Sequence, residues 1–321
     1  MKKMLKIIKK QNLDGLLLLD KSIGMTSNRI LQYIKMIFNA KKAGYIGTLD
    51  PLATGLLPIC FGEYTKFSQY LTNTDKTYLV TALLGEKTNT ADKYGFLIKK
   101  RDVNVTKKNI IKKINLFKGK IKQKPPMYSA IKYKGIPLYK YARKGIEISN
   151  LEYRNITIFQ IKLLSFNKNK IKLHIHCSKG TYIRSIIDDL GDQLNCGAHI
   201  IKLRRILISH ISILNKNVIT LEQLKILIMN YKNHQLNTFL IKKLLLPIDY
   251  IIYHIPKLYL SDLLIKKIIN GEKIKLKSVI DKIKIFCIFR KKKFNFIGIC
   301  HINDNGYIIK CKLMNYVKNF Y

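Results

Sequence analysis

The chain has 321 residues, of which 47% are apolar, and its 60 Lys and Arg exceed its 19 Asp and Glu to give a formal net charge of +41. A chain of this length and apolar content can bury a real core over two domains, which excludes a disordered tail. The positive charge favours a polyanionic partner such as nucleic acid, although the abundance of Lys, Ile and Asn also fits a compositional bias of the whole genome.

The sequence carries no recognisable membrane or secretion signal. No stretch reaches the roughly 18 uncharged apolar residues of a membrane-spanning helix, and Lys residues interrupt the apolar ones in the N-terminal MKKMLKIIKKQNLDG, unlike in a signal peptide. Six cysteines occur without a CxxC pair, which is typical of reduced thiols in a cytosol. We therefore expect a cytoplasmic protein. The cysteines are Cys60, Cys177, Cys196, Cys287, Cys300 and Cys311.

The first expected elements are a strand and a helix. The run GLLLLD at 15–20 is typical of a short buried strand, and apolar residues recur at helical spacing over 30–38. Ser27 is the expected N-cap of this helix, which should continue through Asn39. Residues 41–55 are rich in Gly, Lys and turn formers, so we expect a loop there, in the kind of segment that often carries chemistry.

The next region alternates strands with polar connections. From Tyr78 the run YLVTALLG predicts a strand, and a polar connection over 85–95 leads to a second strand near 96–98. Helical spacing follows at 110–117. The segment 118–134 has no clean period and contains two adjacent prolines, so we expect an extended basic loop.

A helix, two strands and a second helix are predicted in the following third of the chain. Residues 136–145 have helical spacing that stops at a glycine, and 156–164 return to strand character. Residues 171–178 alternate strictly, as a half-buried strand does. Apolar positions over 183–190 then repeat as in an amphipathic helix. Tyr182 and Arg184 lie at this strand-to-helix junction, off the apolar stripe.

The last stretch looks like a separate β module. A helix should follow Thr220, Leu246-Pro247 marks a boundary region, and Ser261 is the expected cap of another helix. Asp304-Asn305-Gly306 is a favourable hairpin turn. The expected strands of the module are IKIFCIFR at 283–290, FNFIGICH at 294–301 and GYIIKCKL at 306–313.

The sequence contains no clear pattern for a metal site or for a nucleotide-cofactor site. His174 and His176 should point to the opposite strand face from Cys177, and neither His176-Cys177 nor CGAH at 196–199 has zinc spacing. The chain also lacks GxxxxGK[ST] and a GxGxxG after a strand. We therefore expect no metal and no cofactor.

One acid stands alone in the stretch GTLDPLATG at 47–55. Asp50 has no other acid within twelve residues on either side, and by itself it is most simply a turn residue ahead of Pro51. A two-carboxylate hydrolase would require a second acid close to it in space. The available acids are Asp75, Glu86, Asp92, Asp188 and Asp189.

Several longer motifs occur in a fixed order along the chain. They are GLLLLDK, AGYIGTLDPLATGLLPICFGEYTKFSQYL, DKTYLVTALLG with TNTADKYG, PPMYSAIKYKG with LYKYARKGIEI, and HCSKGTYIRSIIDDLG with CGAHIIKLRR. Together they resemble the bacterial tRNA pseudouridine synthase B (TruB) family from about Leu13 to Tyr250. Members of this family convert the uridine at position 55 of the tRNA T-loop to pseudouridine, without metal or cofactor.

The resemblance implies a fold and a division of the chain. The fold would be α+β, a mixed and largely antiparallel sheet of the pseudouridine-synthase type with flanking helices, plus a small C-terminal PUA-like β module. The implied parts are a basic N-terminal arm at 1–12, a catalytic domain at 13–250 and an RNA-binding module at 251–321.

The resemblance also implies three catalytic residues. Asp50 would be the nucleophile or the group that takes part in proton movement at the sugar, since one carboxylate is enough when nothing leaves the enzyme. Arg184, from the SKGTYIR motif, would pair with Asp50 and orient it. Tyr78, from the DKxY motif, would stack on the target base and could act in the proton movement that completes the rearrangement.

Further positions carry over as substrate-binding residues. Tyr182 and Leu203 would enclose the base, and Asp92 would have a structural or pocket-ordering role. Tyr45 stands where the family usually has His; it can stack on a base and donate one hydrogen bond but cannot become a cation. Ser22 stands where the family has Pro.

Basic residues would contact the RNA. Lys21, Lys66 and Arg143 match basic positions of family motifs as phosphate or active-site contacts, and the segment 118–134 could clamp the stem. The target uridine must be everted before it can react, so RNA contacts elsewhere must offset the cost of unstacking. The expected partner is the T-stem and loop of tRNA, bound by a monomer. A non-catalytic tRNA-binding protein or folding chaperone on a synthase scaffold remains the alternative.

Overall fold

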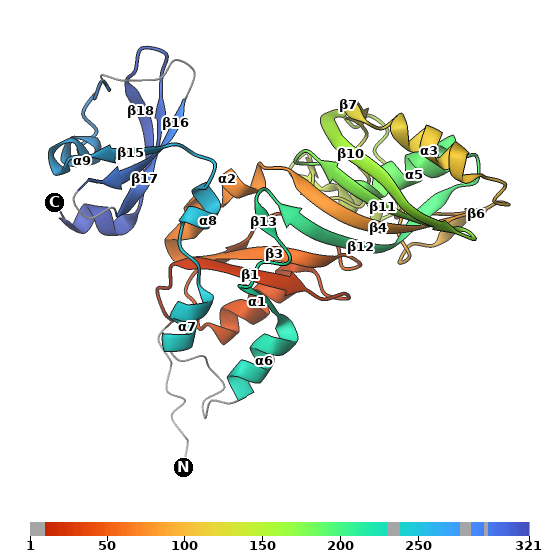
Figure 1. Cartoon of the computed structure of the whole chain (residues 1–321), viewed down its shortest axis with the longest axis horizontal. Helices are drawn as coiled ribbons and strands as arrows, with labels where there is room; N and C mark the ends of the chain where they lie inside the picture. Colours follow the sequence, from red (N-terminus) through yellow and green to blue (C-terminus); the bar gives the residue numbers. More distant parts are fainter. Residues whose placement is uncertain (1–9, 230–237, 277–283, 292–294, 321) are drawn as a thin grey trace.

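The computed structural model describes residues 10–229, 238–276, 284–291 and 295–320. Within them the chain forms one large sheet with helices against it and a smaller sheet built from its C-terminal part (Figure 1). Most of the predicted N-terminal arm lies outside the described residues.

The large sheet is mixed and mostly antiparallel. Its strands follow the order β14-β1-β3-β12-β4-β11-β10-β7, with β2 added to β3 and β13 to β12. Within this sheet, only the described pairs β1–β14 and β3–β12 run parallel. These strands are β1 (Gly15–Lys21), β2 (Ala43–Tyr45), β3 (Thr54–Phe61), β4 (Lys76–Leu84), β7 (Gly119–Gln123), β10 (Arg154–Asn167), β11 (Lys170–Cys177), β12 (Ala198–Ile208), β13 (Ile211–Ser212) and β14 (Val218–Thr220).

The strand β1 shows why its sequence is a run of leucines without alternation. Leu17 and Leu19 face one core, while Leu16 and Leu18 face the other, so both sides of the strand are buried. The first core is closed by five helices whose apolar stripes lie on one side of the sheet. These helices are α1 (Ser27–Ile37), α3 (Lys107–Asn115), α5 (Ile183–Gln193), α6 (Leu221–Met229) and α7 (Thr238–Leu244).

The second core joins the far side of β1 and β3 to the C-terminal part of the chain. It includes Phe67, just before α2 (Ser68–Thr72), and residues of α8 (Asp249–Ile252). The ring of Phe67 meets that of Phe296 edge to face, with centroids 5.2 Å apart. The smaller sheet therefore packs against the large domain through a shared apolar core.

The smaller sheet confirms the β module predicted for the tail. Its strands pair in the order β15-β16-β17-β18, and the helix α9 (Asp262–Ile269) connects β15 to the rest. At the predicted hairpin turn Gly306 has φ +80°, and Asn303 accepts a hydrogen bond from the backbone N–H of Tyr307 at 2.8 Å. The strands are β15 (Lys257–Leu260), β16 (Ile285–Arg290), β17 (Phe296–Ile302) and β18 (Ile308–Leu313).

The predicted start of α1 was one residue late. Thr26 is the N-cap, and its hydroxyl accepts a hydrogen bond from the N–H of Arg29 at 3.1 Å. Ser27 is instead the first helical residue, and its side chain is used by another segment. The helix also ends at Ile37, two residues before the predicted Asn39.

Three segments expected without strands contain short ones. The loop 41–55 includes β2, and the basic segment 118–134 includes β7, an edge strand paired with β10, as well as β8 (Lys132–Tyr133). The predicted helix over 136–145 begins as β9 (Ile136–Pro137), so that α4 is only Leu138–Ala142. These strands are too short to show a hydrophobic period, so pairing with neighbouring strands decides where they form. The strand expected near 96–98 is present as β6 (Leu97–Lys100). It pairs with β5 (Glu86–Thr88), which lies within the expected polar connection over 85–95.

No helix among the described residues is both long enough and apolar enough to cross a bilayer.

Candidate active site

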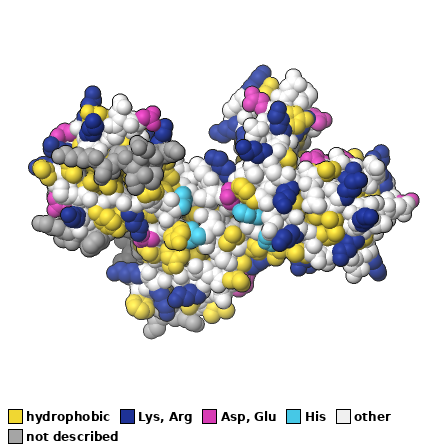
Figure 2. Space-filling view, turned by 45° about the horizontal axis from the view of Figure 1, so that its top comes forward, with side chains coloured by type: hydrophobic (Ala, Val, Ile, Leu, Met, Phe, Trp, Pro, Cys, Tyr) yellow, Lys and Arg dark blue, Asp and Glu magenta, His cyan; other side chains and the backbone are white. Residues whose placement is uncertain are grey.

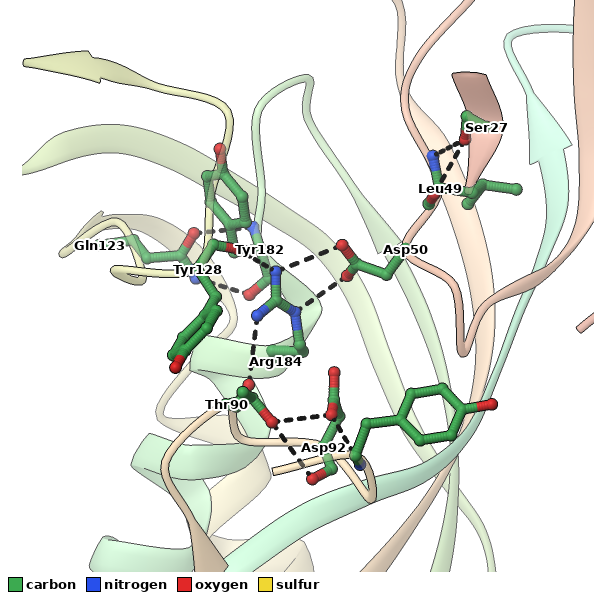
Figure 3. A network of polar contacts seen from close by, with 10 residues as sticks. Ser27, Leu49, Asp50, Thr90, Asp92, Gln123, Tyr128, Tyr182 and Arg184 are labelled. Atoms are coloured by element: carbon green, nitrogen blue, oxygen red, sulfur yellow. Dashed lines mark hydrogen bonds and ion pairs between the residues drawn. The ribbon is translucent and has the colours of Figure 1, made fainter. Parts of the chain in front are cut away.

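Asp50 lies in the loop between β2 and β3, on the face of the sheet that carries α5. The hydroxyl of Ser27, in α1, accepts from the N–H of Leu49 at 2.9 Å and donates to the carbonyl of the same residue at 2.8 Å (Figure 3). Ser27 therefore fixes the residue just before Asp50 from the helix side. A loop held in this way presents its carboxylate in one position.

Asp50 forms a bidentate ion pair with Arg184, the second residue of α5. Arg184 Nε lies 2.9 Å from Asp50 Oδ2, and Nη2 lies 3.3 Å from Oδ1. The Arg184 side chain is 5% exposed, whereas that of Asp50 is 36% exposed. The cation is thus buried beneath the acid, and the open side of the carboxylate faces solvent.

Two backbone carbonyls complete the contacts of the guanidinium. Arg184 also donates to the carbonyl of Thr90 at 3.2 Å and to that of Tyr128 at 2.8 Å. These carbonyls belong to separate loops, so the guanidinium joins three segments at one point (Figure 3). An Arg that uses its planar fork in this way has little freedom to turn, and it fixes the direction of the carboxylate.

Asp92 orders the turn that provides the Thr90 carbonyl. Its Oδ1 accepts from the hydroxyl of Thr90 at 2.8 Å and from the N–H of Tyr94 at 3.0 Å, and its carbonyl accepts from Thr88. Asp92 is buried. Asp92 therefore orders the turn whose Thr90 carbonyl binds Arg184.

Tyr182 precedes α5 and is held by a residue that the sequence analysis did not single out. The buried side chain of Gln123 accepts from the N–H of Tyr182 at 2.8 Å and donates to its carbonyl at 3.0 Å. Burial raises the pKa of the Tyr182 hydroxyl, which lies near Ser129. Gln123 thus sets the start of the helix that carries Arg184.

Tyr78 and Leu203 lie on neighbouring strands in the same core as the helix α5. Leu203 pairs with Val80 across β12 and β4, and Tyr78 pairs with Arg205. Both side chains are buried. Burial raises the pKa of Tyr78, while the guanidinium of Arg205 beside its hydroxyl opposes that rise.

Of the two uses predicted for Lys21, a phosphate contact or an active-site contact, the structure contradicts the first. This side chain has no exposed surface, and its ammonium donates to three backbone carbonyls, those of Ala53 at 2.7 Å, Ser22 at 2.9 Å and Pro51 at 3.4 Å. Burial lowers its pKa to about 8, although Asp50 nearby opposes the shift. Lys21 therefore supports the loop of Asp50 through its backbone carbonyls, and it is too deeply buried to contact a phosphate.

Lys66 is also used differently from the prediction. It lies at the far end of β3, in the turn η1 (Gly62–Lys66), where its ammonium pairs with Glu63 and donates to Asn315 Oδ1 at 2.8 Å. Lys312 in turn donates to the Lys66 carbonyl at 3.0 Å. These contacts join the large domain to the C-terminal module, so Lys66 is occupied away from Asp50.

Arg143 and Tyr45 remain open to a ligand. Arg143 is exposed at the end of α4, with its guanidinium 5.3 Å from the ring centroid of Tyr139. Tyr45 is half-buried at the end of β2, a few residues before Asp50. Neither is fixed by an ion pair with a described residue.

The acids weighed as a second carboxylate have other partners. Asp75 lies 4.0 Å from His176, Glu86 lies 3.9 Å from Lys100, and Asp188 lies 3.2 Å from Lys87. Asp189 faces Asp188 and Asp192, and burial raises its pKa to about 6. Within the described part of the chain, no group of three His, Cys, Asp or Glu side chains could hold a metal ion.

A pocket of about 640 Å³ opens on the face of the sheet opposite Asp50. Thr77 and Leu79, which flank Tyr78 in β4, line it together with Arg204 of β12. Since neighbouring strand residues point to opposite faces, this pocket is separate from the Asp50 site. No carboxylate lines it.

Sequence reasoning missed three residues that position the site, namely Ser27 in its present role, Gln123 and Arg205. The signal for Arg205 is in the motif GTLDPLATG itself. A Cβ on Gly47 would lie 3.1 Å from Arg205 Nη1, and one on Gly55 would lie 2.2 Å from the Arg205 carbonyl oxygen. The two glycines therefore leave room for an arginine.

Known sequences resemble this chain over nearly its whole length. The family model described as the TruB family pseudouridylate synthase N-terminal domain matches residues 35–183, and the one described as the tRNA pseudouridylate synthase B C-terminal domain matches residues 184–253. A Buchnera aphidicola protein named tRNA pseudouridine synthase B is 46% identical over 312 residues, covering 97% of this chain and 99% of that protein. Proteins of the same name from Wigglesworthia glossinidia brevipalpis and Aeromonas salmonicida are 48% and 44% identical, and they cover 95% and 96% of this chain.

Solved structures share the fold at lower identity. The crystal structure of a Cbf5-Nop10-Gar1 complex contains a chain that matches with a TM-score of 0.69 and 23% identity, covering 94% of this chain and 84% of that one. A structure of an H/ACA RNP bound to a substrate RNA containing 2'-deoxyuridine gives a TM-score of 0.69 at 21% identity, with 94% and 85% covered. The predicted α+β fold is confirmed.

Proposed function

The chain belongs to the TruB family of pseudouridylate synthases, and from this premise we propose that it isomerises uridine to pseudouridine at position 55 in the T-loop of tRNA. The observation that carries the proposal is the ion pair of Asp50 with Arg184, in which a buried cation holds a carboxylate whose other side is open. The enzyme is an isomerase, since the base leaves the sugar through a nitrogen atom and is joined to the same sugar again through a carbon atom.

One carboxylate is enough for this reaction. The bond from the sugar to N1 of the base breaks, the base turns within the pocket, and a bond from the same sugar to C5 forms. No water has to be activated and no product leaves between the two steps, so a second acid has no task. Asp50, aimed by Arg184, acts at the sugar as nucleophile or in proton movement.

Tyr78, Tyr182 and Leu203 supply the walls for the base. They lie on β4, before α5 and on β12, around the face that carries Asp50. An aromatic ring stacks on any base, and burial excludes water from the reacting atoms. In this proposal the hydroxyl of Tyr78 takes part in the proton movement that restores the ring.

RNA is the partner of this enzyme, and the T-stem and loop are the proposed part of tRNA. On the face drawn in Figure 2, Lys and Arg side chains are spread over both lobes and acidic side chains are fewer. Such a surface attracts a phosphate backbone and makes binding depend on salt. Arg143 is the proposed phosphate contact and Tyr45 a proposed stacking residue, because both are accessible.

The remaining features of the proposal concern the whole molecule. The proposed active form is a monomer, in which the contacts of Arg184 to Asp50, Thr90 and Tyr128 are made within a single chain. We assign residues 13–250 to catalysis and the PUA-like module at 251–321 to RNA contact. Since tRNA is the substrate, the proposed location is the cytoplasm.

Asp50→Asn tests the proposal most directly. The amide keeps the shape of the side chain but removes the charge, so we expect tRNA binding to stay within about twofold while conversion falls by at least about 10⁴-fold. Conversion is measured by carbodiimide-adduct mapping of a tRNA transcript, because the isomerisation does not change the mass.

Asp20→Asn is the matched control. Asp20 also forms a two-bonded pair with an arginine, Arg204, at 3.0 and 2.6 Å, but on the other side of the sheet. Normal conversion by Asp50→Asn would contradict the proposed role. Wild-type protein that binds tRNA without producing an adduct at the T-loop uridine would favour the non-catalytic alternative.

A further inference from the structure

Arg205 is a buried cation without an acid. Its side chain is 1% exposed, and it forms no ion pair with any residue in the described part of the chain. Burial lowers the pKa of the guanidinium. A buried charge without a counter-ion is costly, so an arginine at such a position needs a specific use.

The backbone of Arg205 lies between the two strands that carry the site. In the sheet it pairs with Tyr78 of β4 on one side and with Gly55 of β3 on the other. The absence of a side chain at Gly55 lets the two backbones approach, because a Cβ there would lie 2.2 Å from the Arg205 carbonyl oxygen. Arg205 is thus in register with both the tyrosine and the loop of Asp50.

The guanidinium binds both ends of the Asp50 loop. Its Nε donates to the carbonyl of Leu56 at 2.8 Å, and its Nη2 donates to those of Gly47 at 2.9 Å and Ile46 at 3.4 Å. Ile46 and Gly47 precede Asp50, and Leu56 follows it. The same guanidinium also lies against the hydroxyl of Tyr78.

The adjacent Arg204 provides a contrast within the same strand. It points to the opposite face, where it pairs with Asp20 beside the 640 Å³ pocket. Arg204 is neutralised by an acid, whereas Arg205 is satisfied by carbonyls and by a phenol. Two consecutive residues of one type therefore have different electrostatic roles.

We propose that Arg205 is a positioning residue of the reaction, which holds the loop of Asp50 in register with β4 and directs the Tyr78 hydroxyl to the base. This inference rests on the proposed isomerisation and extends it to a residue that does not touch the substrate. It accounts for the buried charge, for the two glycines and for the pairing with Tyr78 together.

The chemistry gives the cation beside Tyr78 a purpose. In the isomerisation one proton leaves C5 and one is gained at N1, so no net proton is consumed. A phenolate can accept the proton from C5 and become a phenol, and the guanidinium favours the phenolate. Asp50 and Cys177 also face Tyr78, and both disfavour its ionisation. Arg205 is the facing group that favours it.

The test compares Arg205→Met with Arg204→Met in the full-length protein. Both changes remove one positive charge from β12, but only the first removes the contacts to Tyr78 and to the loop. We expect the single-turnover rate of conversion at pH 7 to fall by about 100-fold in Arg205→Met and by less than about threefold in Arg204→Met. The rise of the rate with pH should shift upward by about one unit or more in Arg205→Met alone.

A spectroscopic measurement makes the test independent of activity. With 3-fluorotyrosine placed at position 78, ¹⁹F NMR follows ionisation of that ring in the free protein. We expect the titration to move to higher pH in Arg205→Met and to stay unchanged in Arg204→Met. Arg205→Lys keeps the charge without the fork, so its titration should lie between the two, and it serves if Arg205→Met does not fold.

The outcomes separate this inference from the proposed function. Equal rate losses in the two Met variants, with the same ¹⁹F titration, would contradict the positioning role and leave Arg205 with a structural role only. The proposed activity of the wild type would not be affected by that result. A wild type without conversion would instead remove the proposed function, whereas the ¹⁹F result would still report whether Arg205 controls Tyr78.

Discussion

The two ends of β3 use the same residue types for opposite purposes. At its start, Lys21 and Arg205 are buried and satisfied by backbone carbonyls, and Asp50 keeps one ion pair and an open side. At its far end, Lys66 and Glu63 neutralise each other and bind Asn315 of the C-terminal part. The first end is the proposed reactive site, and the second is a joint between two parts of the molecule.

The difference lies in what satisfies each cation. A carbonyl accepts a hydrogen bond without cancelling the charge, so the field of Lys21 and Arg205 persists around Asp50 and Tyr78. A carboxylate cancels the charge, so the joint has little field beyond its own contacts. Burial of cations among carbonyls therefore distinguishes the proposed reactive end from the joint, and three substitutions can test this contrast.

The largest effect is expected for Arg184→Lys. Lysine keeps the charge but cannot reach both oxygens of Asp50 together with the carbonyls of Thr90 and Tyr128. We expect the single-turnover rate to fall by about 100-fold because the carboxylate is no longer aimed, with tRNA binding nearly unchanged. Arg204→Lys, the same change in a pair on the opposite face, should leave the rate within about twofold. Equal losses of rate in the two variants would show that orientation of the Asp50 carboxylate by Arg184 does not contribute to the rate.

Lys21→Met should have an intermediate effect. It removes the ammonium that donates to the carbonyls of Ala53 and Pro51, so we expect the rate to fall by about tenfold as the Asp50 loop loosens. Burial lowers the pKa of Lys21 from 10.5 to about 8. Between these two values the unfolded chain binds the proton more tightly, so the contribution of Lys21 makes the free energy of unfolding rise with pH.

Urea unfolding of Lys21→Met at several pH values between about 8 and 10.5 checks this sign. The variant should lack the part of the rise that Lys21 supplies. An unchanged slope in the variant would mean that the ammonium is solvated and does not support the loop.

The smallest effect on activity is expected at the joint, for Glu63→Gln. Burial raises the pKa of Glu63, but hydrogen bonds from Lys66 and Asn315 outweigh it and hold the pKa below its ordinary value. The substitution should lower the free energy of unfolding by about 1 kcal/mol at pH 7 and change the rate less than about twofold.

The stability difference at the joint also has a predicted pH dependence. The pKa of Glu63 is lower in the folded state than in the unfolded chain. Its contribution to the free energy of unfolding is therefore present at neutral pH and is lost as the pH falls through the folded-state pKa and the carboxylate is protonated. The wild type and Glu63→Gln should therefore converge at low pH. A large loss of conversion in Glu63→Gln would instead show that the joint controls the Asp50 site.

The sequence predicted the elements whose hydrophobic period is strong and the residues whose motif is long. The run of leucines in β1, the alternation of β11 and the helix α5 were all expected where they occur. The motif SKGTYIR also predicted that Arg184 pairs with Asp50, which the structure shows. A local pattern fixes such features because one face of each element must be buried.

The errors arose where a local pattern competes with a distant partner. Lys21 and Lys66 were assigned to phosphate or active-site contacts because they match basic positions of the family motifs. In the structure Lys21 donates to the carbonyl of Ala53, and Lys66 donates to the side chain of Asn315. Ser27 was assigned to the cap of its own helix, whereas Leu49 uses its hydroxyl. A donor's partner twenty or more residues away leaves no periodic signal in the sequence.

The large sheet is divided by its shortest parallel contact. β12 meets β3 only where Arg204 pairs with Thr54 and Arg205 with Gly55, but it follows β4 from Ala198 to Ile208. Asp50 belongs to the half that contains β3, whereas Arg184 and Tyr78 belong to the other half. A bend of the sheet between β3 and β12 would therefore change the distance between Asp50 and Arg184. The alignment of the proposed catalytic pair thus depends on the stiffness of the sheet.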